Sequence, residues 1–119
     1  MTDRELLELA AKAAGIQPVY CYESRRNCLR VGDKKSYVIW RPLTDDGDAL
    51  RLAVKLGIDI GFGFDEQDRV VCILIDGAAT YASQYENDIY FATRLAIVRA
   101  AAEIGRTTPD RTQPVEVTP

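Results

Sequence analysis

The sequence predicts a single α+β domain in which one antiparallel sheet carries helices on both faces. This is an α-β-α layered sandwich of order α-β-β-β-α-β-β-(β)-α. Apolar residues recur at helical spacing in three segments, and in the segments between them they alternate with polar residues or glycine. The chain of 119 residues is long enough for one hydrophobic core and too short for two.

The first helix is expected over residues 3–14. Thr2 and Glu5 have the spacing of a capping box, in which each side chain accepts a hydrogen bond from a free backbone N–H. Gly15 suits the position after the helix, where a positive φ is needed. The apolar stripe of this helix consists of Leu6, Leu7, Ala10, Ala11, Ala13 and Ala14.

An antiparallel meander is expected next, with strands at residues 19–23, 28–31 and 36–41. If Glu23 lies opposite Cys28, then Cys21 lies opposite Arg30. The two cysteines are then diagonal neighbours, a placement that disfavours a disulfide between them.

A second helix is expected from Thr44 or Asp45 to about Leu56, with Gly57 after it. Its first turn is rich in aspartate, which the helix dipole favours at that end. Its core face is expected to hold Ala49, Leu50, Ala53, Val54 and Leu56.

A hairpin is expected from residues 58–64 and 69–75. Pairing Phe64 with Arg69 places Phe62 opposite Val71. Both faces of this hairpin are apolar, so helices or a partner chain must cover both.

Residues 80–85 are expected to add an edge strand, and a last helix is expected from Asn87 or Asp88 to about Ile104, ended by Gly105. The buried face of this helix is expected to hold Phe91, Leu95, Val98 and Ala102, and its exposed face Arg94, Arg99 and Glu103.

The predicted domain spans residues 1–106, and residues 107–119 are predicted to form a flexible tail. This last segment has three prolines and four threonines and almost no apolar side chains. Such a composition buries too little surface to offset the entropy of ordering.

The composition excludes several kinds of chemistry. The chain has no histidine, which removes Ser-His-Asp and Cys-His catalysis and every histidine-ligated metal. Its three cysteines include no Cys-x-x-Cys pair. No metal, cofactor or catalytic residue is therefore expected. The chain lacks a signal-peptide pattern and any apolar run of about 20 residues, so no membrane insertion is expected.

Three blocks of the sequence, residues 5–16, 40–58 and 92–106, together resemble small accessory proteins of tailed phages and prophages that contain a phage ABA sandwich domain. The most specific block is the middle one, in which Trp40 and Pro42 precede an aspartate-rich helix start. The resemblance implies an α-β-α layered fold, a phage origin, the cytoplasm of a bacterial host and no known activity. By analogy with such proteins, we expect a non-enzymatic protein that binds a host protein or ribonucleoprotein complex, such as an anti-CRISPR or another anti-defence inhibitor.

The charge distribution suggests an acidic partner-binding surface. Residues 43–90 carry ten acidic and three basic side chains. An acidic surface can engage a basic protein groove as a nucleic-acid mimic does. The alternative is that these acids are only helix caps and loops. The candidate residues are Asp45, Asp46, Asp48, Asp65, Glu66 and Asp68.

A second hypothesis is a nucleotide or nucleic-acid site on the hairpin at residues 20–41, where cations and aromatic rings occur together. The net charge of −3 and a pI near 4.9 oppose it. The alternative is a solvent-facing hairpin whose aromatic rings pack inward. Either hypothesis is compatible with a homo-oligomer. The candidate residues are Arg25, Arg26, Arg30, Lys34, Lys35, Trp40 and Arg41.

Overall fold

The computed structural model of the protein describes residues 1–64, 69–75, 78–85 and 88–109. Within these ranges it holds three helices and six strands, and the α+β class and the predicted order of elements are confirmed. The elements are α1 (Asp3–Ala14), β1 (Val19–Glu23), β2 (Cys28–Gly32), β3 (Tyr37–Trp40), α2 (Asp46–Leu56), β4 (Asp59–Phe64), β5 (Arg69–Ile75), β6 (Ala78–Tyr85) and α3 (Ile89–Thr107).

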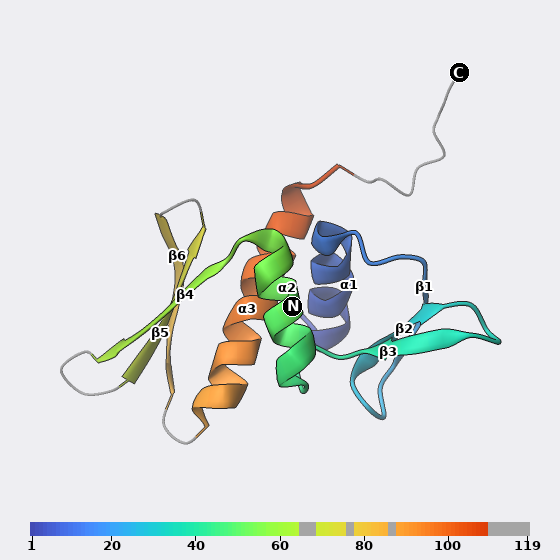
Figure 1. The fold of residues 1–119 in the computed structure, drawn as a ribbon, viewed down its shortest axis with the longest axis horizontal. Helices are drawn as coiled ribbons and strands as arrows, with labels where there is room; N and C mark the ends of the chain where they lie inside the picture. The colour runs from blue at the N-terminus through green and yellow to red at the C-terminus, as the bar shows by residue number, and fades with distance from the viewer. Residues whose placement is uncertain (65–68, 76–77, 86–87, 110–119) are drawn as a thin grey trace.

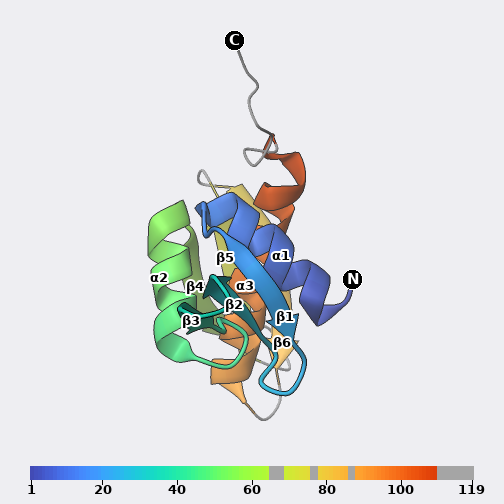
Figure 2. The same cartoon turned by 90° about the vertical axis from the view of Figure 1, so that its right-hand side faces the viewer.

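The layering differs from the predicted α-β-α sandwich. The strands form two antiparallel sheets, β1-β2-β3 and β4-β5-β6, instead of one. Figure 1 shows the helices between these two sheets, and Figure 2 looks onto the first sheet with the second behind the helices. The helices form a layer of their own because α1 and α3 bury alanine-rich faces, and each sheet then covers one side of that layer.

The packing of α1 on α3 explains a second difference. Gly105 was expected to end the last helix, but it lies inside α3, which runs on to Thr107 with Thr108 as its C-cap. A Cβ built at Gly105 would stand 2.0 Å from the carbonyl oxygen of Leu9 in α1. This glycine therefore permits a close approach of two helix backbones.

The predicted helix starts are confirmed. Thr2 and Glu5 form the capping box, with the Glu5 N–H 3.1 Å from the Thr2 hydroxyl oxygen. The carboxylate of Asp45 accepts a hydrogen bond from the N–H of Asp48 at 2.8 Å. Asp88 caps α3 in the same way, accepting from the N–H of Phe91 at 3.0 Å. These bonds satisfy backbone donors that have no partner within the helix.

The strand registers also match the prediction. Glu23 pairs with Cys28 and Cys21 with Arg30, and both cysteines are free thiols. In the second sheet Phe64 pairs with Arg69, and the edge strand β6 is longer than expected. Residues 65–68, where the sequence predicts a turn, lie outside the described residues.

Four residues that were expected in the core are exposed instead. Leu50 and Val54 on α2 are 59% and 73% exposed, and Phe62 on β4 and Phe91 on α3 are 60% and 48% exposed. In their place Leu52 is buried. For the two residues of α2, the physical reason is that this helix buries only a narrow face, through Ala49, Leu52 and Ala53. The other apolar side chains of α2 are therefore left partly or fully exposed to solvent.

The predicted tail begins two residues too early, because Thr107 is helical and Thr108 caps α3. The hydroxyl of Thr108 donates to the carbonyl of Ile104 at 2.7 Å. The rest of the predicted tail, from residue 110 onward, lies outside the described residues. In the part of the chain that is described, no helix has the length and hydropathy to cross a bilayer.

Candidate functional site

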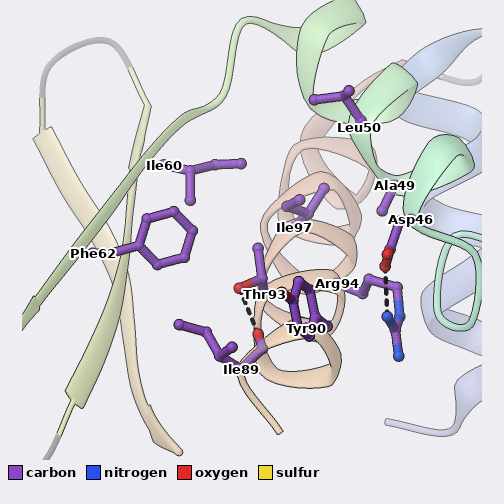
Figure 3. A pocket seen from close by; sticks show the side chains of 10 residues that line it. All are labelled: Asp46, Ala49, Leu50, Ile60, Phe62, Ile89, Tyr90, Thr93, Arg94 and Ile97. Carbon is purple, nitrogen blue, oxygen red and sulfur yellow. Dashed lines mark hydrogen bonds and ion pairs between the residues drawn. The ribbon is translucent and has the colours of Figure 1, made fainter.

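A groove of about 540 Å³ opens where α2, β4 and α3 meet, on the side of the helix layer that faces the second sheet (Figure 3). Most of its lining is apolar. The lining residues are Asp46, Ala49, Leu50, Ile60, Phe62, Ile89, Tyr90, Thr93, Arg94 and Ile97.

The groove has a buried floor and exposed walls. Ala49 and Ile97 are only 2% and 3% exposed and form the floor. Leu50, Phe62 and Tyr90 are 59%, 60% and 67% exposed and come from three different elements. Large apolar side chains are thus brought together from distant parts of the sequence without being covered. Such a patch is typical of a binding surface.

An ion pair at one end of the groove fixes its electrostatics. The Arg94 guanidinium donates to the Leu43 carbonyl at 3.0 Å and to the Asp46 carboxylate at 2.6 Å (Figure 3 draws the second of these bonds). The Arg94 side chain is only 16% exposed, whereas that of Asp46 is 69% exposed. The cation is therefore held inside, and the carboxylate faces water.

A further polar group of the lining is also engaged, because the Thr93 hydroxyl donates to the Ile89 carbonyl at 2.6 Å. Among the ten lining residues no hydroxyl, thiol or amine is paired with a base. The arrangement is therefore suited to holding apolar groups beside one exposed carboxylate.

Two exposed apolar side chains lie outside the groove on the same two helices. Val54 lies one helical turn after Leu50, and Phe91 follows Tyr90 at the start of α3. Sequence reasoning missed the exposure of Leu50, Val54 and Phe91 because it assigned all three to the core. One signal was present: apolar residues occupy most positions from 49 to 56, more than a single helix face can bury.

The predicted acidic residues that the structure describes have local roles on α2. Asp45 caps the helix, and Asp48 accepts from the Arg41 N–H at 2.9 Å and from the Arg51 guanidinium at 2.6 Å. Only Asp46 lines the groove. Within the described residues no three cysteine, aspartate or glutamate side chains gather as metal ligands would. The other three candidates, Asp65, Glu66 and Asp68, lie outside the described residues.

The predicted basic and aromatic residues lie on the β1-β2-β3 sheet and its turns, with one exception. Trp40 is buried in the core and cannot stack on a ligand, which corrects its assignment to that site. Tyr20 and Tyr37 take its place, with ring centroids 6.5 Å apart and planes inclined by 21°. The Arg30 guanidinium lies 4.9 Å from the centre of the Tyr37 ring.

Glu23 organises two of these cations. Its carboxylate accepts hydrogen bonds from Arg26 at 2.5 and 2.7 Å and from Arg30 at 2.6 and 3.0 Å. These bonds, from Arg26 first and then Arg30, lower the pKa of Glu23 from 4.5 to about 2. The same bonds raise the pKa of both arginines. Beside the pair, Arg25 is exposed and has no partner among the described side chains.

Comparisons of the chain with protein-family models, with curated proteins and with solved structures found no significant match. The resemblance to phage accessory proteins therefore stays a prediction, and the functional argument depends on the geometry of the site.

Proposed function

We propose that this protein is a non-enzymatic binding protein whose groove between α2, β4 and α3 takes an apolar segment of a partner protein. The observation that supports the proposal is the grouping of Leu50, Phe62 and Tyr90 around a buried floor, each more than half exposed. Burying such side chains contributes roughly 1.5–3 kcal/mol each, and aromatic anchors in pockets are typical hot spots of protein interfaces.

Charge complementarity favours a partner with a basic residue beside its apolar anchors. Asp46 presents its carboxylate at the groove, while Arg94 is held back by Leu43. A lysine or arginine of the partner can approach Asp46 without displacing Arg94. Asp46, one of the acidic residues predicted from the sequence to bind a partner, then lies at the rim of the site, and the apolar groove forms its centre.

The resemblance to phage accessory proteins supports a more specific version of the proposal. The partner is then a host protein or a ribonucleoprotein complex in the bacterial cytoplasm. Binding would block that partner, as an anti-CRISPR or another anti-defence inhibitor does. This version rests on analogy between proteins of similar lifestyle.

Site-specific photo-crosslinking in a bacterial host lysate tests the groove directly. A photo-reactive amino acid replaces Leu50 in one variant and Val38 in the control. Val38 is 66% exposed and lies on β3, in the other sheet. We expect a nuclease-resistant protein crosslink at position 50 only, joined to a partner peptide with apolar residues flanked by lysine or arginine.

An affinity measurement with the crosslinked partner completes the test. Leu50→Lys should weaken binding at least tenfold, because it places a charge on the groove wall, and Val38→Lys should leave binding unchanged. Equal crosslinking at both positions, or full affinity of Leu50→Lys, would overturn the proposal. A crosslink from position 50 to a second copy, with a dimer in analytical ultracentrifugation, would make the groove a self-association site instead.

A further inference from the structure

The face of the β1-β2-β3 sheet that points away from the helices carries a second surface, independent of the groove. Leu29 and Trp40 turn into the core, and side chains alternate across each strand. Arg30 and Tyr37 therefore lie on the opposite, outward face, where Tyr20 joins them. We infer that this outward face binds a single strand of nucleic acid, with a base stacked on the Tyr20–Tyr37 platform.

The aromatic part of the surface is already arranged for stacking. Tyr20 and Tyr37 are 44% and 37% exposed, and their rings lie within 21° of parallel. The Arg30 guanidinium sits over Tyr37, and its bonds to Glu23 hold it there. Exposed rings with a fixed guanidinium plane stacked over one of them form a platform on which bases can stack. Such a platform accepts any base, because every base has a π face.

The cations that would meet phosphates lie at both ends of this platform. Arg25 is in the turn before β2, and Lys34 and Lys35 are in the turn after it. No side chain partner occupies any of the three among the described residues. The five residues of β2 between these turns span about 17 Å. That length suits a nucleic-acid segment of about four nucleotides, which is at the lower end of the site sizes of single-strand binding proteins.

The net negative charge of the protein does not oppose this local site. Residues 21–42 carry six basic and two acidic side chains, a local charge of +4. The second sheet lies on the other side of the helix layer (Figure 1). At about 0.15 M salt, exposed charges act over roughly 8 Å, so the local cations dominate the potential that a phosphate meets.

Nucleic acid is favoured over an acidic protein because the surface combines unpaired cations with exposed rings. An acidic peptide would use the cations alone, whereas a strand of nucleic acid uses both. Stacking on an aromatic side chain and counterion release on binding phosphates are separately measurable. Each can be removed by its own substitution.

The test measures fluorescence anisotropy of a labelled ten-nucleotide single strand with the full-length protein at 50 and 200 mM salt. Tyr20→Ala should weaken binding at least about fivefold, the lower bound for loss of one stacked base. Val38→Ala is the control and should change nothing, because it removes an exposed side chain from β3 on the face that carries Trp40, opposite to Tyr37. Lys34→Gln with Lys35→Gln should reduce the slope of log K against log salt by about 1.4.

Three results would overturn the inference. The first is no binding at 50 mM salt, and the second is an equal loss of affinity in Tyr20→Ala and Val38→Ala. The third is full affinity of Tyr20→Ala together with an unchanged salt slope in the double lysine variant. Competition by poly-glutamate that equals competition by unlabelled strand would assign the surface to acidic proteins instead. None of these results bears on the groove, whose crosslinks come from other residues.

Discussion

Gly105 of α3 lies so close to Leu9 of α1 that no side chain fits between the two helix backbones. A Cβ at Gly105 would meet the Leu9 carbonyl oxygen at 2.0 Å and its carbonyl carbon at 2.7 Å. The atoms that it would meet belong to the backbone, which cannot rotate away as a flexible side chain can. The separation of the two central helices is therefore set by this glycine.

Gly105→Ala should destabilise the protein by about 1–3 kcal/mol or more, because the two helices must move apart. Chemical denaturation monitored by circular dichroism gives the change in the free energy of unfolding. Gly15→Ala is the control, because Gly15 has a φ of 69° and nothing within 4 Å of its Cβ position. The control should lower the free energy of unfolding by only about 1 kcal/mol, the cost of placing a residue with a side chain at a positive φ. A stabilised Gly105→Ala protein would contradict the close contact.

Sequence signals that act over a few residues predicted much of this fold. Helix starts at Thr2, Asp45 and Asp88 follow from hydrogen bonds within one turn, and the pairing of Glu23 with Cys28 follows from a short connection. The layering could not be predicted in this way. It depends on the approach of Gly105 to α1, a contact between residues at opposite ends of the chain.

Leu29→Ala should cost about 2–5 kcal/mol, because Leu29 is fully buried and its removal leaves a cavity. Phe62→Ala should cost less than about 1 kcal/mol, because the Phe62 side chain is already 60% exposed. Urea denaturation of both variants tests the two values. A larger loss for Phe62→Ala than for Leu29→Ala would place Phe62 in the core, where the sequence pattern had assigned it.

The residues of the groove illustrate why the site was harder to predict than the fold. The alternation around Phe62 predicts a strand correctly, but alternation says which side chains share a face and not which face is covered. Leu50 and Phe62 are twelve residues apart in sequence. Only the position of α3 shows that both side chains line one groove.

Acidification should weaken the protein through Glu23. Its pKa is about 2 in the folded protein, below its ordinary value of 4.5. A depressed pKa means that the ionised carboxylate stabilises the fold fully above pH 4.5, and that this contribution is lost as the pH falls from about 4.5 to about 2. Glu23→Gln should therefore approach the wild type in stability over that window.

Denaturation midpoints between pH 2 and 7 test this dependence. Glu103→Gln is the control, because it removes another arginine-paired carboxylate that is 64% exposed. Glu23→Gln and the wild type should differ in denaturation midpoint, and this difference should shrink on acidification. The corresponding difference between the wild type and Glu103→Gln should shrink less. A constant difference across the whole range would show that the bonds of Glu23 to Arg26 and Arg30 do not persist in solution.

Deleting residues 110–119 should change the free energy of unfolding by less than about 1 kcal/mol. The deleted segment has two of the chain's prolines and no periodic apolar pattern, so it has little surface to bury. Deleting from Thr107 onward should cost more, because it removes the bond from Thr108 to Ile104 that finishes α3. Thermal unfolding of both truncations measures the difference. Loss of folding in the shorter deletion would show that the tail packs on the domain.

The acidic surface predicted from the sequence, of which Asp46 lines the groove, leads us to expect that partner binding weakens as salt rises. Steering by a charged surface speeds association with a basic partner, and salt screens this attraction beyond roughly 8 Å at about 0.15 M. Lys substitutions at Asp65, Glu66 and Asp68 should therefore reduce affinity for the partner captured at position 50, mainly through a slower association rate. The melting temperature should stay nearly unchanged if these residues form the turn that the sequence predicts, because charges exposed to water contribute little to folding. Asp46→Lys should weaken binding more strongly, since Asp46 lines the groove itself and the new cation would also face Arg94.

Surface plasmon resonance at 50, 150 and 500 mM salt measures association and dissociation rates separately for the wild type and each variant. If affinity survives both high salt and the triple substitution but falls in Leu50→Lys, binding depends on the apolar groove alone, and the acidic surface has no part in it.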